Sequence, residues 1–409
     1  MYNEETIMHT NHTRRDWLKT AASAVAGAYV AASPLLRAAD APTSPVALAR
    51  CKTYASGELL PAMQKMFDQL GGLGNLVKGK TVAIKINLTG SYTYRLGYEA
   101  SEDTHYTHPS VVATAARLLV KAGARRIRIL ESPWSTAEPL EEYFLRTNWE
   151  PRDILGVGPN VEFENTNYLG FAKKYSRLKV GFGGYVFPAF DLNHSYEDCD
   201  VFVSIAKMKE HATAGVTLSM KNCFGMTPAT IYGQGAGVDE PSESPRGGRS
   251  MVHQGNRQPS KSAPSEKDPK SPRQEGWRVP RTVVDLVSAR PIHLAIIDGI
   301  KSMTGGEGPW IREDLKAVAP GVLLAGLNPI ATDAVAMAVM GFDPMADRGT
   351  PPFERCDSIV KLGEEAGIGT RDLKRIEVIG STIAEARFDF AGMRQARRGK
   401  PIPQVGMRG

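Results

Sequence analysis

The chain has 409 residues, 42% hydrophobic and 23% charged, which is typical of a globular protein with a sizeable core. Its formal net charge is +6, but the basic residues concentrate in residues 233–281 and 387–409, outside the main body. Without these segments and the N-terminus the body is slightly acidic, so we expect no nucleic-acid partner.

Residues 1–39 are predicted to be a twin-arginine signal peptide. Arg14 and Arg15 are followed by a spacer, an aromatic residue, Leu and Lys, then by a weakly apolar stretch and small residues near position 39. The stretch is too short and too weakly apolar for a stable membrane span, which needs about 20 strongly apolar residues. We expect the twin-arginine export machinery as a partner and a periplasmic or extracellular location after folded export. An uncleaved anchor is the alternative.

The pattern over residues 40–385 predicts an α/β fold, with a mostly parallel sheet and helices on both faces. A strand at 80–88, a helix at 109–122 and a strand at 125–131 form a βαβ unit, which implies a parallel pair. Apolar runs predict further strands at 200–206, 293–298, 322–325 and 375–379, with helices at 328–340 and 357–366.

Two segments are predicted to be flexible. Residues 233–278 consist mainly of Gly, Pro, Ser, Gln and charged residues, so they are expected to form a flexible insertion within the α/β domain. A lid that orders on ligand binding is the alternative. Residues 386–409 are predicted to be a basic, flexible tail.

The cysteines indicate no metal cluster. Cys51, Cys199, Cys223 and Cys356 include no CxxC spacing, so neither an iron–sulfur cluster nor a structural zinc site is expected. We interpret them as buried thiols, with pairing in an oxidising periplasm as the alternative.

Polar side chains cluster where the predicted strands end. Ligands of open parallel sheets bind at the carboxyl edge, so these residues are candidates for a binding site. Lysines suit phosphate or carboxylate groups, and the amides lie beside them. The sequence predicts a small anionic ligand, with these substrate-binding residues: Lys85, Asn87, Lys207, Lys209, Lys221 and Asn222.

Histidines and carboxylates at the same edge suit proton transfer or metal binding. The candidate catalytic residues are His108, His211, Glu131 and Asp298, and the candidate ligands of a divalent or transition metal are His108, His211 and Glu307. Each residue alone has a plainer interpretation, such as a solvated lysine, a loop histidine or a turn-forming aspartate. Only their convergence favours a site.

Seven segments carry a family resemblance: 85–87 (KIN), 107–109 (THP), 123–132 (GARRIRILES), 200–211 (DVFVSIAKMKEH), 217–225 (TLSMKNCFG), 297–309 (IDGIKSMTGGEGP) and 325–341. Together they resemble the domain-of-unknown-function 362 family, a prokaryotic group. The resemblance implies an α/β fold with a site formed by these segments, and it implies no particular reaction. Some members carry a fused ferredoxin-like iron–sulfur module, but this chain lacks those cysteine runs, so that redox role is not carried over.

Two classes of function fit these patterns. The favoured hypothesis is an enzyme that acts on a small anionic substrate, with or without a metal. The alternative is a non-catalytic periplasmic binding protein or a cofactor-maturation factor, in which the same side chains hold cargo. A matched acid–base pair in a closed pocket distinguishes the enzyme from the carrier.

Overall fold

The computed structural model describes residues 40–234, 236, 247–259, 261–311 and 315–397. The predicted signal peptide at 1–39 therefore lies outside the described residues, as do parts of the predicted insertion and the last part of the predicted tail.

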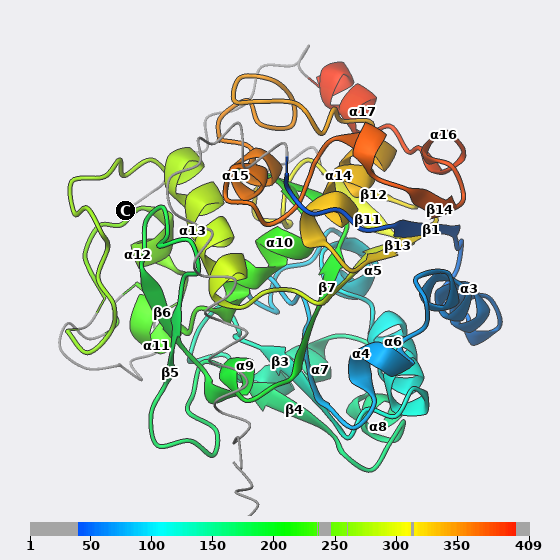
Figure 1. Cartoon of the computed structure of the whole chain (residues 1–409), viewed down its shortest axis with the longest axis horizontal. Helices are drawn as coiled ribbons and strands as arrows, with labels where there is room; N and C mark the ends of the chain where they lie inside the picture. Colours follow the sequence, from blue (N-terminus) through cyan, green and yellow to red (C-terminus); the bar gives the residue numbers. More distant parts are fainter. Residues whose placement is uncertain (1–39, 235, 237–246, 260, 312–314, 398–409) are drawn as a thin grey trace, which may run out of the picture.

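An eight-stranded sheet runs through the molecule (Figure 1), with the strand order β14-β1-β13-β10-β7-β2-β3-β4. Seven strands are parallel to one another, and β13 alone runs against its neighbours. The predicted, mostly parallel α/β fold is confirmed. The strands are β1 (Val46–Arg50), β2 (Thr81–Lys85), β3 (Arg126–Glu131), β4 (Val161–Asn165), β7 (Val201–Lys207), β10 (Leu294–Gly299), β13 (Val322–Gly326) and β14 (Val378–Gly380).

The central strands are buried on both faces. Ile84 of β2 lies between Val203 of β7 and Ile129 of β3, and all three side chains are fully buried. Near-continuous apolar sequence is what a parallel strand covered on both faces requires. Polar side chains at the ends of these strands are consequently buried too.

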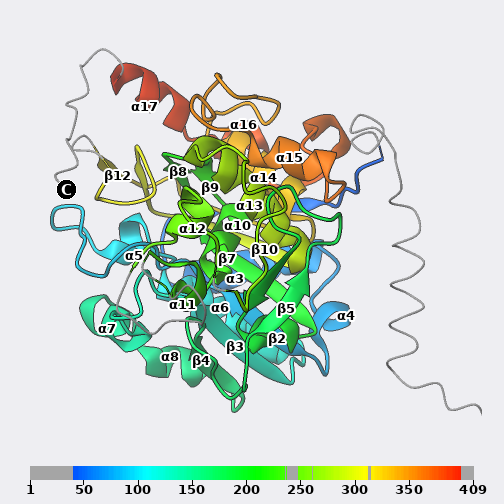
Figure 2. The same ribbon diagram turned by 90° about the vertical axis from the view of Figure 1, so that its left-hand side faces the viewer.

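Helices cover both faces of the sheet (Figures 1 and 2), as the sequence predicted. One face packs against α3 (Ser56–Gln69), α4 (Gly74–Val77), α6 (Pro109–Lys121) and α8 (Pro151–Leu155). The other packs against α10 (Ser219–Asn222), α13 (Glu275–Ala289), α14 (Pro329–Val339) and α15 (Ile359–Glu365).

Short strand pairs and helices lie outside the eight-stranded sheet. Lys207 ends β7, and Lys209–His211 form β8 of a buried hairpin. The antiparallel pairs are β5 (Ser176–Lys179) with β6 (Ala189–Leu192), β8 (Lys209–His211) with β9 (Gly215–Thr217), and β11 (Ser302–Thr304) with β12 (Lys316–Val318). The remaining helical segments are α5 (Ser101–Thr104), α7 (Leu140–Arg146), α9 (His194–Glu197), η1 (Cys223–Met226), α11 (Ala229–Tyr232), α12 (Ser250–His253), η2 (Leu373–Arg375), α16 (Ile383–Ala386) and α17 (Phe390–Arg397).

Much of the predicted flexible insertion is packed against the domain. Glu266 is buried and accepts hydrogen bonds from both Arg278 and Arg273, at 2.7 Å each. Arg249 is buried as well. These polar groups pair inside the protein instead of with water, so parts of the segments 247–259 and 261–278 are anchored without a large apolar content. The flexibility of the insertion stays a prediction.

The predicted tail also begins with packed residues. Ala386 and Phe390 are fully buried, and α17 starts at Phe390. The first residues of the predicted tail are therefore anchored, and the flexibility of the tail stays a prediction. Residues 398–409 lie outside the described part of the chain.

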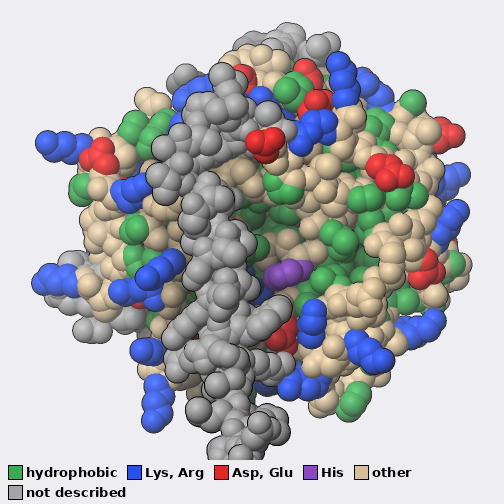
Figure 3. Space-filling view, viewed as in Figure 1, with side chains coloured by type: hydrophobic (Ala, Val, Ile, Leu, Met, Phe, Trp, Pro, Cys, Tyr) green, Lys and Arg blue, Asp and Glu red, His purple; other side chains and the backbone are tan. Residues whose placement is uncertain are grey.

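The surface and the thiols add two observations. On the face shown in Figure 3, Lys and Arg side chains are dispersed around the perimeter among acidic ones.

The four cysteines are free thiols, and only Cys199 has an appreciable exposed fraction. Within the described ranges, no helix is both long enough and apolar enough to cross a membrane.

Candidate functional site

The carboxyl ends of four neighbouring parallel strands carry charged side chains. Lys85 ends β2 and Glu131 ends β3, while Lys207 ends β7 and Asp298 lies at the end of β10. All four are almost completely buried. They form two separate ion pairs, one at β2–β3 and one at β7–β10.

The β2–β3 pair joins Lys85 Nζ to Glu131 Oε1 at 2.5 Å. The carboxylate also accepts the backbone N–H of Leu88 at 2.8 Å and that of Ser132 at 3.0 Å. Burial raises the pKa of the Glu131 carboxyl, and the Lys85 ammonium opposes that shift. A Cβ on Gly225 would lie 3.1 Å from Lys85 Nζ, so the pair packs tightly against the backbone after α10.

A network of amides connects this pair to α10. The Asn222 amide nitrogen donates to Ser204 Oγ at 3.0 Å and to the Lys85 carbonyl at 3.2 Å. Its oxygen accepts from the Asn87 amide at 3.2 Å. Both amides are consequently held in fixed orientations at the ends of β2 and β7.

The buried carboxylate of Asp333, on α14, holds the start of α10 in place. It accepts from the backbone N–H groups of Ser219 and Met220 at 2.9 and 3.0 Å, and from Ser219 Oγ at 2.6 Å. Burial raises the pKa of Asp333 to about 7. By fixing the start of α10, Asp333 also fixes the position of Lys221, which directly follows Met220.

Lys221 is a half-buried cation whose ammonium contacts an aromatic ring. Its Nζ lies 4.4 Å from the centre of the Phe224 ring, a cation–π contact. Within the described residues it makes no hydrogen bond and no ion pair. Burial lowers the pKa of Lys221 to about 8, opposed by the negative charge of Glu307.

His211 and Glu307 lie side by side, with His211 Nδ1 3.7 Å from Glu307 Oε2. His211 Nδ1 accepts the backbone N–H of Thr213 at 3.2 Å, which places the proton of the neutral ring on Nε2. Burial and the neighbouring Lys221 ammonium lower the pKa of His211 well below its usual value. At neutral pH this ring is therefore an uncharged donor through Nε2.

A cavity of about 270 Å³ brings seven of the predicted residues together. They are Lys85, Asn87, Glu131, His211, Lys221, Asn222 and Glu307. Trp134, Trp310, Tyr94 and Phe224 also line it, together with Thr217, whose buried hydroxyl has no hydrogen-bond partner among the described residues.

Arg249 forms part of the same wall, and the sequence reasoning missed it. Its guanidinium donates to the carbonyls of Thr227, Ser132 and Trp134 at 2.7, 3.1 and 2.9 Å. These bonds connect the insertion to the loop after β3. Burial lowers the pKa of Arg249 to about 10. Composition alone had assigned this segment to a flexible loop, and nothing in its pattern distinguishes this arginine.

Three cations and two carboxylates line the cavity: Lys85, Lys221 and Arg249 against Glu131 and Glu307. Lys209 is fully buried and its Nζ donates to Asn87 Oδ1 at 2.9 Å, but burial lowers the pKa of Lys209 well below its usual value, so the charge balance rests on the three lining cations. The local balance is therefore positive, which favours an anion in the cavity.

The β7–β10 pair is closed on itself. Lys207 Nζ donates to Asp298 Oδ2 at 2.8 Å, to the Glu102 carbonyl at 2.7 Å and to the Tyr54 hydroxyl at 3.1 Å. Asp298 further accepts the Tyr54 hydroxyl at 3.0 Å and the His108 backbone N–H at 3.1 Å. Every hydrogen-bonding position around this pair is filled by the protein.

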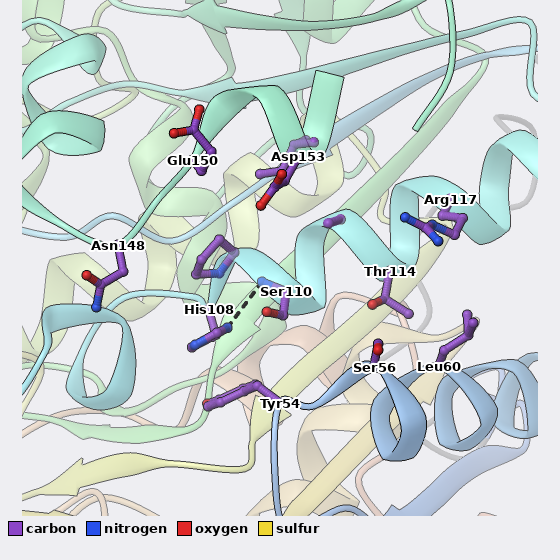
Figure 4. Close-up of a pocket in the computed structure, with 13 residues that line it drawn as sticks. Tyr54, Ser56, Leu60, His108, Ser110, Thr114, Arg117, Asn148, Glu150 and Asp153 are labelled. Carbon is purple, nitrogen blue, oxygen red and sulfur yellow. Dashed lines mark hydrogen bonds between the residues drawn. The ribbon is translucent and has the colours of Figure 1, made fainter. Parts of the chain in front are cut away.

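His108 lines a different cavity, of about 380 Å³, between α3, α6 and α8 (Figure 4). Its ring stacks on Tyr54 with 3.5 Å between centroids. Its Nδ1 accepts the Ser110 backbone N–H at 3.1 Å, which begins α6. Burial and the Lys207 ammonium lower the pKa of His108 to about 3, so this imidazole is neutral.

The structure thus divides the predicted site residues. It does not bring His108, Asp298, Lys207 or Lys209 to the lining of the strand-end cavity. The three predicted metal ligands do not lie together: His211 and Glu307 are neighbours, whereas His108 lines the other cavity. Among described residues, no group of three or more His, Cys, Asp or Glu side chains is arranged to hold a metal ion.

The fold and the cavity define an α/β protein with a cation-rich site at the carboxyl ends of its parallel strands. The chain belongs to the family described as "Domain of unknown function (DUF362)", whose model matches residues 82–338. The match includes all the residues that the sequence predicted for the site.

One curated relative is a thylakoid-associated protein of Synechocystis sp. It is 31% identical over 189 residues, which are 46% of this chain and 51% of that protein. The chain thus matches about half the length of this relative.

Two solved structures are similar in fold. A Thermotoga maritima protein has a TM-score of 0.29 at 14% identity, covering 66% of this chain and 55% of its own. The lactate racemase apoprotein from Thermoanaerobacterium thermosaccharolyticum has a TM-score of 0.33 at 11% identity, covering 68% and 55%.

Proposed function

We propose that this protein binds a small anion, a carboxylate or a phosphate, in the strand-end cavity. The observation that carries the proposal is Lys221, a half-buried ammonium in the cavity wall that makes no hydrogen bond or ion pair with the described residues. Taking a charge out of water is costly unless a partner compensates it, so an anionic ligand is the natural counterpart.

Other groups in the cavity support an anion. The Thr217 hydroxyl is buried without a hydrogen-bond partner in the described part of the chain, and the neutral His211 ring has a donor on Nε2. Ammonium, hydroxyl and imidazole N–H groups together suit the several oxygens of a phosphate or carboxylate. Lys85 adds positive charge nearby while being held by Glu131.

We further propose that the protein is an enzyme that moves a proton on this ligand. Burial shifts the pKa of Glu131 upwards and the pKa of Lys221 downwards, so both move towards neutrality. Two such groups in one cavity are what acid–base catalysis at neutral pH requires. This pairing favours an enzyme over a passive carrier.

A thermal-shift screen tests anion binding. Phosphate, malonate, benzoate and phenyl phosphate would be compared with neutral amides of similar size. At ten times its Kd, a ligand that binds only the folded state stabilises it by about 1.4 kcal/mol. We expect anions to raise the Tm of the wild type and of Lys65→Met, an exposed control on α3, but not of Lys221→Met. A panel without any shift would contradict the proposal.

Proton transfer has its own readout. NMR in D₂O would follow exchange of the acidic C–H protons of a bound carboxylate, with Glu131→Gln as the comparison. Exchange in the wild type that the variant loses supports an enzyme. A ligand that binds tightly without any exchange identifies a carrier instead.

We also propose export through the twin-arginine pathway, on the basis of Arg14 and Arg15. Replacing both arginines with lysine keeps the charge and removes the paired guanidinium groups of the signal. We expect the double variant to accumulate inside the cell, measured by fractionation. Unchanged export of the double variant to the periplasm would contradict the proposed twin-arginine signal.

A further inference from the structure

We infer that the ligand of the strand-end cavity carries a planar aromatic or conjugated ring next to its anionic group. The inference rests on the proposed anion binding and specifies which anions the site selects. Four aromatic side chains line this one cavity: Tyr94, Trp134, Phe224 and Trp310.

The rings and the charges occupy different depths. Lys85 and Glu131 are at most 2% exposed, whereas Trp134 and Tyr94 are each 45% exposed. Lys85 and Glu131 therefore lie at the inner end of the cavity and Trp134 and Tyr94 at the end that faces solvent, while Phe224, 5% exposed, contacts the half-buried Lys221. A ligand that fills both ends places its anionic group inside and its apolar part between the rings and water.

The two indoles are held close to backbone that only glycine allows. The Trp310 ring lies so near Gly90 and Gly308 that a Cβ on either residue would overlap it. The Trp134 ring covers Gly247 in the same way. Trp310 also contacts Tyr94, with 5.3 Å between ring centroids.

Fixed rings with one open face make good stacking surfaces. They lose little conformational entropy when a ligand binds, which is the advantage of preorganisation. An aromatic ring in offset or edge contact with them gains more than its buried area alone provides. Because three segments far apart in the sequence supply these rings, the ring end is a feature of the assembled site.

The size of the cavity narrows the ligand class. A volume of about 270 Å³ is at the lower end of the range for small-molecule sites, roughly 300–1,000 Å³. One or two fused rings with a single carboxylate or phosphate fit that space, whereas a dinucleotide does not. The geometry points to an aromatic or heteroaromatic acid or monophosphate.

Isothermal titration of the purified protein tests the inference with matched probes. Benzoate is compared with cyclohexanecarboxylate, which has the same charge and ring size but is not flat, and phenyl phosphate with inorganic phosphate. We expect the aromatic member of each pair to bind about tenfold more tightly, since one stacked ring contributes roughly 5- to 100-fold. Trp134→Ala and Trp310→Ala should reduce that ratio towards one, leaving the affinity for cyclohexanecarboxylate within about twofold.

Phe171→Ala is the matched control, because Phe171 is an aromatic side chain 93% exposed and outside the cavity lining. It should leave both affinities unchanged. Trp134→Phe and Trp310→Phe keep a ring and should retain most of the preference, even if an alanine variant folds poorly. Equal affinity for benzoate and cyclohexanecarboxylate, or a preference that survives both alanine changes, overturns the ring assignment and leaves anion binding in place. Failure of every anion to bind overturns the proposed function itself.

Discussion

The two ion pairs at the strand ends use the same residue types for different purposes. At β7–β10, Lys207 and Asp298 satisfy each other and are enclosed by Tyr54 and backbone groups. At β2–β3, Lys85 and Glu131 line a cavity that also contains Lys221, whose ammonium makes no hydrogen bond or ion pair with the described residues. The first pair is closed within the fold, and the second lines the cavity for which we propose anion binding.

The difference shows that burial alone does not identify a functional lysine. Lys207, Lys209 and Lys85 are all fully buried, yet each has its donors occupied by the protein. Lys221 is less buried and has donors to spare. What separates a ligand-binding cation from a structural one is the unused hydrogen-bonding capacity that faces a cavity.

The largest expected effect comes from breaking the closed pair. Asp298→Ala leaves the Lys207 ammonium buried without its counter-ion, so the free energy of unfolding should fall by about 3–5 kcal/mol. Urea unfolding followed by circular dichroism measures this. The double variant Lys207→Met, Asp298→Leu should recover much of the loss, because no charge then remains buried. A single variant as stable as the wild type would show that the pair does not stabilise the fold.

The second prediction concerns the pH dependence of anion binding. The pKa of Lys221 is lowered to about 8, so its ammonium is protonated below this pH and neutral above it. Affinity for an anion that stays fully ionised should therefore fall as pH rises from 7 to 9, when measured by calorimetry. Lys221→Met should bind about 10- to 150-fold more weakly at pH 7, the loss of one charged hydrogen bond. An equally steep fall in Lys221→Met would assign the titration to another group.

The third prediction sharpens the role of the insertion. Arg249→Met removes the hydrogen bonds that connect the insertion to the loop after β3. We expect faster proteolysis within residues 247–278 and severalfold weaker anion binding, since the wall that carries Trp134 loses its support. Limited proteolysis followed by mass spectrometry measures the first effect. Arg126→Met, which removes a half-exposed ion pair with Glu162 outside the insertion, is the control that should change neither.

The smallest effect should separate the two histidines. His211→Gln retains a donor but changes its position, so affinity for the anion should fall by about two- to fivefold. His108→Gln alters the other cavity and should leave that affinity unchanged within error. Titrations of both variants with the same anion measure the contrast. A larger loss in His108→Gln would place the ligand in the cavity between α3, α6 and α8.

The sequence predicted the framework because strand burial leaves a local pattern. Runs such as those of β7 and β10 are mostly apolar, and their carboxyl ends had to lie at one edge of the sheet. The same reasoning brought Lys85, Glu131 and Lys221 into one region. It assigned Lys207 and Lys221 the same role, because the partners that distinguish the two side chains come from distant segments.

The parts that the sequence missed share a physical cause. Arg249 lies in a segment poor in apolar residues, which packs through polar pairs such as Glu266 with Arg278. Such pairing leaves no periodic pattern of apolar residues from which it could be predicted. Trp134 and Trp310 were missed because each lies in a loop, where only the assembled structure shows that both line one cavity.

A crystal of the protein soaked in 4-bromobenzoate tests the central claim most directly, because the bromine locates the ring by anomalous scattering and the carboxylate locates the anion site. The account predicts the carboxylate within hydrogen-bonding distance of Lys221 Nζ and the ring against Trp134 or Trp310. A carboxylate bound next to His108 in the other cavity, or a strand-end cavity that stays empty while the ligand binds elsewhere, would contradict it.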